Sequence, residues 1–178
     1  MFVFASFLTY LNYQKDWFKQ ISLIEQMKRS DIFGQHTTFL FVDTTSHLNG
    51  MQREYFYFYE FARMLERAFG EQIRFGMASK KFCTRFADDL DTFFEFSKEV
   101  RPIPQLHMQQ YQARLPQFEV TIEQGKFYLT RNSTLRLLYW QFFDRQKFER
   151  AVNEVVALEY KPLDEIGLQQ LCEFSSRL

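Results

Sequence analysis

The densest group of side chains capable of chemistry follows a short apolar run, residues 37–43. It consists of Asp43, Thr45, His47, Asn49 and Arg53. Ligands of open α/β sheets bind beyond the carboxyl ends of the strands, and groups of these types hold phosphates and sugar hydroxyls. The five residues are therefore the candidate ligand-binding site. The alternative is that Asp43 caps the loop backbone through an Asx turn.

The spacings of the common catalytic and cofactor sites are absent. Neither GxGxxG nor GxxxxGK[ST] occurs, so we expect no Rossmann cofactor and no P-loop nucleotide. His36, His47 and His107 include no pair three or four residues apart, so we predict no metal site. The acidic run 88–91 suits a helix N-terminus better than Mg²⁺. There is no GxSxG elbow, and we assign no catalytic residue and no cofactor.

The two cysteines, Cys83 and Cys172, lie far apart and form no Cys-x-x-Cys pair. Two cysteines do not make a disulfide framework. One bridge between them is conceivable, but we expect two buried thiols.

Charge and composition exclude some classes of partner. The chain has 178 residues, with 22 Lys and Arg against 22 Asp and Glu, so its formal net charge is zero. Phosphate neutralisation needs an excess of basic side chains, so we expect no nucleic-acid partner. Aromatic residues make up 19% of the chain, including 23 Phe. More aromatics than one small core holds would leave some at a surface, where exposed apolar patches mark a protein partner or a bilayer.

Residues 1–14 carry no charge, and the first charged side chain is Lys15. The apolar part is too short to cross a bilayer, which takes about 20 residues. The segment is the start of a core helix, an interfacial anchor, or the end of a membrane span. Tyr10, Tyr13 and Trp17 are the candidate membrane-interface residues, because Tyr and Trp favour headgroup depth.

The elements that position these residues follow from the hydrophobic pattern. A helix is expected over 6–29, with its apolar side formed by the line from Tyr10 to Ile24 and with Lys19 on its polar side. A buried strand over 37–43, a helix over 51–69 that ends at Gly70, and a strand over 72–78 make a βαβ unit with parallel strands.

The sequence pattern of the second half of the chain predicts a connector, a hairpin and helices. Residues 101–116 contain three prolines and four glutamines, as a connector would. Alternation on both sides of Gly125 predicts a hairpin of strands 117–124 and 126–130. Helices starting near Asn132 and Asp144, a brief strand over 158–160 and a final helix over 163–177 follow.

The predicted fold class is α/β, with a small mainly parallel sheet flanked by helices, an added β-hairpin and C-terminal helices. We expect an apolar N-terminal segment over 1–14 and an α/β core over 15–100. The connector, hairpin and helical tail over 101–178 belong to the same domain.

The most distinctive sequence pattern lies between Trp17 and Gly76. It includes Phe41-Val42-Asp43, Leu48-Asn49, the helix Arg53–Glu60 and Arg74-Phe75-Gly76. Over roughly residues 10–80 it resembles the soluble C-terminal tail of polytopic bacterial membrane proteins of unassigned role. The resemblance implies a membrane upstream and no catalytic residues. The spanning helices of such proteins are not among these 178 residues.

The functional expectation is a non-catalytic packing or interaction module of a membrane-associated bacterial protein. Its partners would be the membrane, transmembrane helices or another protein, on a side of the membrane that the sequence leaves open. The alternative is an enzyme-like domain that binds a small phosphorylated or sugar ligand at the Asp43 loop. A cytoplasmic module without a membrane link is the third possibility.

Overall fold

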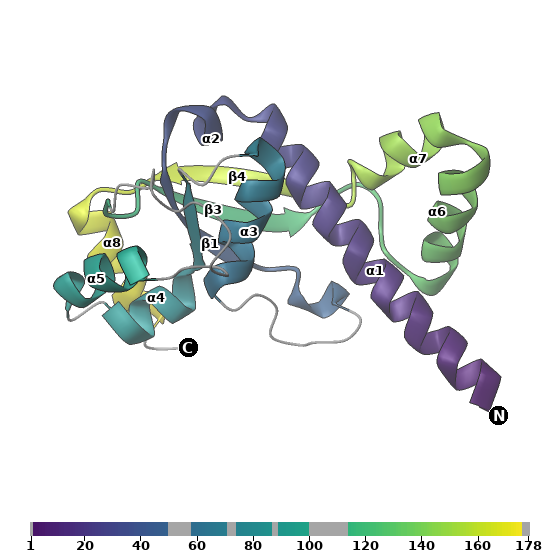
Figure 1. Ribbon diagram of the computed structural model, residues 1–178, viewed down its shortest axis with the longest axis horizontal. Helices are drawn as coiled ribbons and strands as arrows, with labels where there is room; N and C mark the ends of the chain where they lie inside the picture. Colours follow the sequence, from purple (N-terminus) through teal and green to yellow (C-terminus); the bar gives the residue numbers. More distant parts are fainter. Residues whose placement is uncertain (1, 50–57, 71–73, 87–88, 100–113, 176–178) are drawn as a thin grey trace. The chain divides into compact units, whose positions relative to one another are not determined.

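The computed structural model describes residues 2–49, 58–70, 74–86, 89–99 and 114–175. The chain is of the α/β class, with a four-stranded sheet and flanking helices (Figure 1). It divides into two compact units that interleave along the sequence. Unit 1 consists of residues 1–26, 43–55 and 122–158, and unit 2 of 27–42, 56–121 and 159–178.

The elements have these bounds. The helices are α1 (Phe2–Arg29), α2 (Asp31–Gln35), the 3₁₀ turn η1 (Ser46–Leu48), α3 (Phe58–Phe69), α4 (Ser79–Phe86), α5 (Leu90–Glu99), α6 (Arg131–Phe143), α7 (Arg145–Val152) and α8 (Glu165–Ser175). The strands are β1 (Thr38–Asp43), β2 (Phe75–Ala78), β3 (Phe118–Gln124) and β4 (Val156–Pro162).

The sheet is mixed and mostly parallel, with strand order β2-β1-β3-β4. β1 and β2 pair in parallel, with Thr38 opposite Phe75 and Phe41 opposite Ala78. The predicted βαβ unit of β1, α3 and β2 is therefore confirmed. Phe39, Leu40 and Phe41 are at most 1% exposed, as expected for a strand covered on both faces.

Gly70 ends α3 as predicted. Its φ is +70°, a region that side chains disfavour, and its N–H donates to the Glu66 carbonyl at 2.7 Å. Most of the predicted connector, 101–116, lies outside the described residues.

The predicted hairpin is half right. β3 matches its first strand, but residues 126–130 form no strand, and the antiparallel partner of β3 is β4. The Gly125 N–H donates to the Val155 carbonyl at 3.0 Å and the Phe127 N–H to the Glu154 carbonyl at 2.8 Å. These bonds hold the segment against the start of β4, and Thr130 then caps α6 through Ser133. β4 is longer than the brief strand predicted over 158–160 and includes Pro162, which the strand tolerates because it lies at the sheet edge.

The two cysteines are not free thiols, contrary to the sequence prediction. Cys83 of α4 and Cys172 of α8 form a disulfide in unit 2. The bridge lies beside a core of Leu40, Phe75, Met77, Phe82, Phe86, Phe93 and Leu168. Helical periodicity places each cysteine near an apolar face, but nothing in the sequence states that α4 and α8 pack together.

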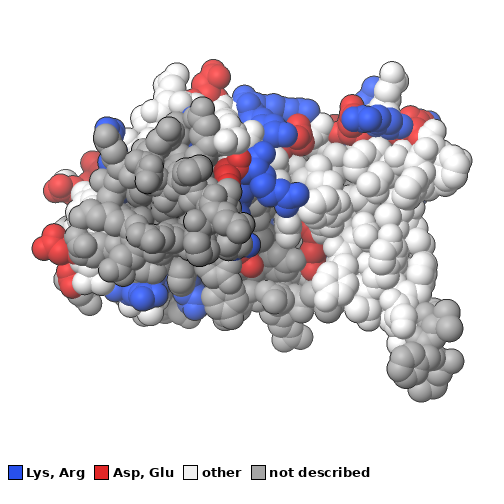
Figure 2. Space-filling view, viewed as in Figure 1, with Lys and Arg blue, Asp and Glu red and all other residues white. Residues whose placement is uncertain are grey.

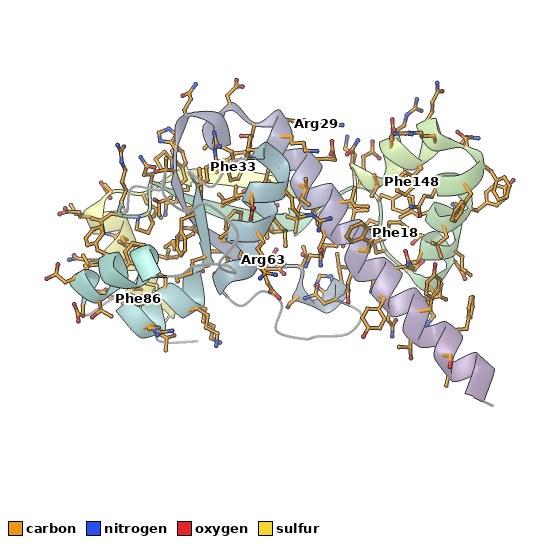
Figure 3. All side chains as sticks on the ribbon, viewed as in Figure 1. Phe18, Arg29, Phe33, Arg63, Phe86 and Phe148 are labelled. Atoms are coloured by element: carbon orange, nitrogen blue, oxygen red, sulfur yellow. A yellow bond between two sulfur atoms is a disulfide. The ribbon has the colours of Figure 1, made fainter. Side chains whose placement is uncertain are left out.

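The inner side of α1 in unit 1 is also not the one that periodicity predicted. Phe18 and Leu23 are fully buried, and the Phe18 ring meets Phe148 of α7 edge-on at 5.7 Å (Figure 3). Lys19, expected on the polar side, is 1% exposed, while Tyr10 is 47% exposed. The periodic signal is ambiguous because aromatic residues occur on both sides of this helix.

Candidate functional site

The polar cluster of unit 1 is centred on Lys19 of α1. Its ammonium donates to Asp43 Oδ2 at 2.8 Å, to Asn49 Oδ1 at 2.8 Å and to the Thr45 carbonyl at 3.3 Å. An ammonium has three N–H donors and no acceptor. Three acceptors therefore satisfy it fully.

Asp43 is placed by the end of β1 and held by its own loop. Its Oδ1 accepts from the Thr45 N–H at 2.9 Å and the Thr45 hydroxyl at 2.6 Å. This is the Asx turn that was the alternative reading of the sequence. On the other side of the loop, the Thr44 hydroxyl donates to the Ile122 carbonyl at 2.7 Å. The loop after β1 is thus fixed at both edges.

Burial dominates the electrostatics of Lys19. It lowers the pKa of the ammonium, and the nearby Asp43 carboxylate opposes that change by favouring the charged form. The side chains of Lys19 and Asp43 are 1% and 11% exposed. A charge pair this far from water is costly to break from one side only.

Sequence reasoning found three members of this cluster, Asp43, Thr45 and Asn49, but missed Lys19. The lysine is 24 residues before Asp43, and its helical position resembles that of a solvated side chain. His47 lies exposed on η1. Arg53 is outside the described residues.

The chemistry open to the cluster is narrow. Both Asp43 oxygens and all three Lys19 donors are used inside the protein, so a phosphate or sugar would have to displace existing bonds. The Asn49 Nδ2 atom is buried without a partner, but one amide donor cannot orient a ligand. We interpret the cluster as a structural tie between α1 and the loop after β1.

A cavity of about 430 Å³ lies in unit 2, near the amino ends of β1 and β3. Its lining includes His36, Leu115, Phe118, Leu163 and Leu168. The His36 Nδ1 atom is buried without a partner. The amide oxygen of Gln117 already accepts from the backbone N–H of residue 37 at 2.9 Å. The lining also includes Asp164 and Glu165, and Asp164 Oδ1 already accepts from the Gly167 N–H at 2.7 Å. An apolar wall with one imidazole and these carboxylates does not by itself define a ligand.

The candidate interface residues of α1 are accessible. Four aromatic side chains at helical spacing are exposed: Phe7 45%, Tyr10 47%, Tyr13 58% and Trp17 38%. We call these four residues the α1 stripe. In Figure 2 an uncharged surface extends over the N-terminal half of α1 and over α6, both parts of unit 1.

Two negative findings apply to the described residues. None of their helices is both long and apolar enough to cross a bilayer. They also contain no group of three or more His, Cys, Asp or Glu side chains placed to hold a metal ion.

Comparison of the chain with models of protein families, with curated proteins and with solved structures finds no match.

Proposed function

We propose that this chain is a non-catalytic interaction domain that lies against a membrane surface through the α1 stripe. The observation that carries the proposal is the exposure of Phe7, Tyr10, Tyr13 and Trp17 on a helix that has no charged side chain before Lys15. Tyr and Trp prefer the headgroup region, where one end of the ring is apolar and the other wet.

The position of the stripe supports a bilayer contact. Ala5, Ser6 and Thr9 are exposed as well as the aromatic residues, so about half of the helix circumference faces outward there without a charge. A helix that is apolar beyond the face it packs needs a second apolar environment. An amphipathic helix at the headgroup boundary finds one without spanning the membrane.

The disulfide bears on the side of the membrane. Structural disulfides persist in oxidising compartments and are rare in the cytosol. The Cys83–Cys172 bridge therefore favours an extracytoplasmic location over the cytoplasmic alternative.

Binding to lipid vesicles tests the proposal. The full chain should float with phospholipid vesicles, and Tyr10→Ser combined with Tyr13→Ser should lower the partition coefficient about tenfold or more. The estimate assumes roughly 1 kcal/mol for each half-buried ring. In a Trp140→Phe background, Trp17 becomes the single tryptophan, and its emission should shift to the blue on vesicle binding.

Ile166→Ser is the matched control, because Ile166 of α8 is an exposed apolar residue outside the stripe, at 65%. It should bind vesicles like the unmodified chain. Equal flotation of the stripe variant and the unmodified chain, or no flotation of either, would refute the role of the stripe.

A further inference from the structure

The most exposed large apolar side chains of the described residues are at a helical turn outside the α1 stripe. Phe142 is 77% and Phe143 74% exposed, at the C-terminal end of α6. Asp144 follows, and α7 begins at Arg145. We call residues 142–145 the α6–α7 tip. Two adjacent phenylalanines kept in water lose the free energy that burial would supply, so a partner for them is expected.

The tip is rigid, so the exposure is built into the fold. Asp144 accepts from the Lys147 N–H at 3.1 Å and caps α7, while its own N–H donates to the Trp140 carbonyl at 2.9 Å. The Phe143 ring stacks on Tyr139 at 4.8 Å. These contacts fix the backbone of the turn and hold the Phe143 ring before any partner binds.

The other face of the helix pair is anchored inside unit 1. Phe148 of α7 packs on Phe18 of α1, and the Gln26 amide donates to the Asn153 carbonyl at 2.7 Å. Leu135 and Tyr139, 41% and 59% exposed, continue the apolar surface along α6 away from the tip. Apolar side chains therefore lie on both sides of α6, one side packed and the other facing outward.

The helix pair that carries the tip has more basic than acidic side chains. Segment 131–152 contains five basic and two acidic residues. All five basic side chains are exposed: Arg131, Arg136, Arg145, Lys147 and Arg150. Two of them pair with the two acids, Arg145 with Glu149 and Lys147 with Asp144, each at 2.8 Å. The segment keeps an excess of positive charge beside an apolar point.

We propose that the α6–α7 tip inserts Phe142 and Phe143 into the interfacial zone of an anionic phospholipid bilayer, with the surrounding basic side chains on lipid phosphates. This deepens the proposed function and rests on it, because it names the lipid class and a second contact. An apolar point on a segment with excess positive charge matches an anionic membrane surface, on whichever side of the membrane that surface lies, because hydrocarbon lies there beneath a layer of negative charge.

The experiment compares vesicles of phosphatidylcholine alone with equimolar phosphatidylcholine and phosphatidylserine. The full chain should bind the anionic vesicles more tightly. Phe142→Ser combined with Phe143→Ser should weaken binding to both compositions about tenfold or more. Arg145→Gln combined with Arg150→Gln should lower affinity for the anionic vesicles about fivefold per charge and leave binding to phosphatidylcholine nearly unchanged. Ile166→Ser is again the control.

The outcomes separate this inference from the proposed function. If the unmodified chain binds no vesicle, both fail. If the α1 stripe variant loses binding while the Phe142/Phe143 variant keeps it, the proposed function stands and the tip inference is overturned. Sedimentation of the chain without lipid tests whether a second copy of the chain binds at the tip instead. If the chain dimerises, and the Phe142/Phe143 variant is monomeric with unchanged vesicle binding, the tip binds a second copy of the chain and the inference is again overturned. The α1 stripe variant and the Phe142/Phe143 variant should have the melting temperature of the unmodified chain, because the substituted side chains are exposed.

Discussion

Replacing Lys19 with methionine should reveal what the buried cluster does. The substitution keeps an unbranched side chain of similar length and removes the ammonium, so three hydrogen bonds are lost and Asp43 keeps its charge in a site only 11% exposed. Removing one partner of a buried ion pair costs about 3–5 kcal/mol. Thr45 still donates twice to Asp43 Oδ1, so we expect a loss near the lower limit, about 3 kcal/mol.

Equilibrium unfolding in urea, followed by tryptophan fluorescence and far-UV circular dichroism, measures this loss. A destabilisation of that size should lower the melting temperature by about 6–12 °C for a chain of this length. Lys28→Met is the matched control. Lys28 is an exposed lysine near the C-terminal end of the same helix, and its replacement should change stability by less than about 0.5 kcal/mol.

A double-mutant cycle with Asp43→Asn tests the cause. Because the asparagine carries no charge, Lys19→Met should cost about 2 kcal/mol less in the Asp43→Asn background than alone. Strictly additive effects, or a loss below about 1 kcal/mol for Lys19→Met, would refute the structural tie. The polar cluster around Lys19 would then again be a candidate ligand-binding site.

Three further predictions follow from local geometry. A Cβ on Gly125 would clash with the backbone oxygen of Glu154, so Gly125→Ala should cost about 2 kcal/mol or more in urea unfolding. A neutral result would contradict the close approach of this backbone at the start of β4. Replacing Cys83 and Cys172 together with serine should cost about 2–5 kcal/mol, and mass spectrometry of the unreduced chain after alkylation should show that neither cysteine carries an alkyl group. The Lys147 side chain and backbone N–H hold the pKa of Asp144 below its usual 3.8. The stability that the Asp144 carboxylate contributes to the fold is therefore present above pH 3.8 and is lost as pH falls through the lower pKa of the folded state. A carboxyl NMR titration that places the Asp144 pKa at or above 3.8 would contradict the cap.

The α/β class follows from local patterns, and this explains why it could be read from the sequence. The run 37–43 has no alternation, which is typical of a strand covered on both faces, and Gly70 supplies the positive φ that ends α3. Asp144 was predicted at the start of α7 because a side chain that accepts backbone N–H groups acts within three residues. Three residues of the α1 stripe, Tyr10, Tyr13 and Trp17, were candidates because they follow one another at helical spacing, but the sequence left open whether they pack or face outward.

Contacts between distant segments could not be predicted from the sequence, because local patterning shows which side chains are apolar and not what they pack against. Residues 126–130 alternate like a strand, but the Gly125 and Phe127 N–H groups donate to the carbonyls of residues 155 and 154, and β4 becomes the antiparallel partner of β3. The pairing of Cys83 with Cys172 depends on α4 packing beside α8.

The sequence by itself determined the class of the fold, the helix ends set by Gly70 and Asp144, and the candidate residues Asp43, Thr45 and Asn49 within one short loop. Tertiary structure decided their role. It buries Lys19 and brings its ammonium to these three residues, so the polar groups satisfy one another, since a charge removed from water must find its partners within the protein. It also decided which aromatic residues face outward, because both sides of α1 and α6 are apolar and only packing selects the side that is covered.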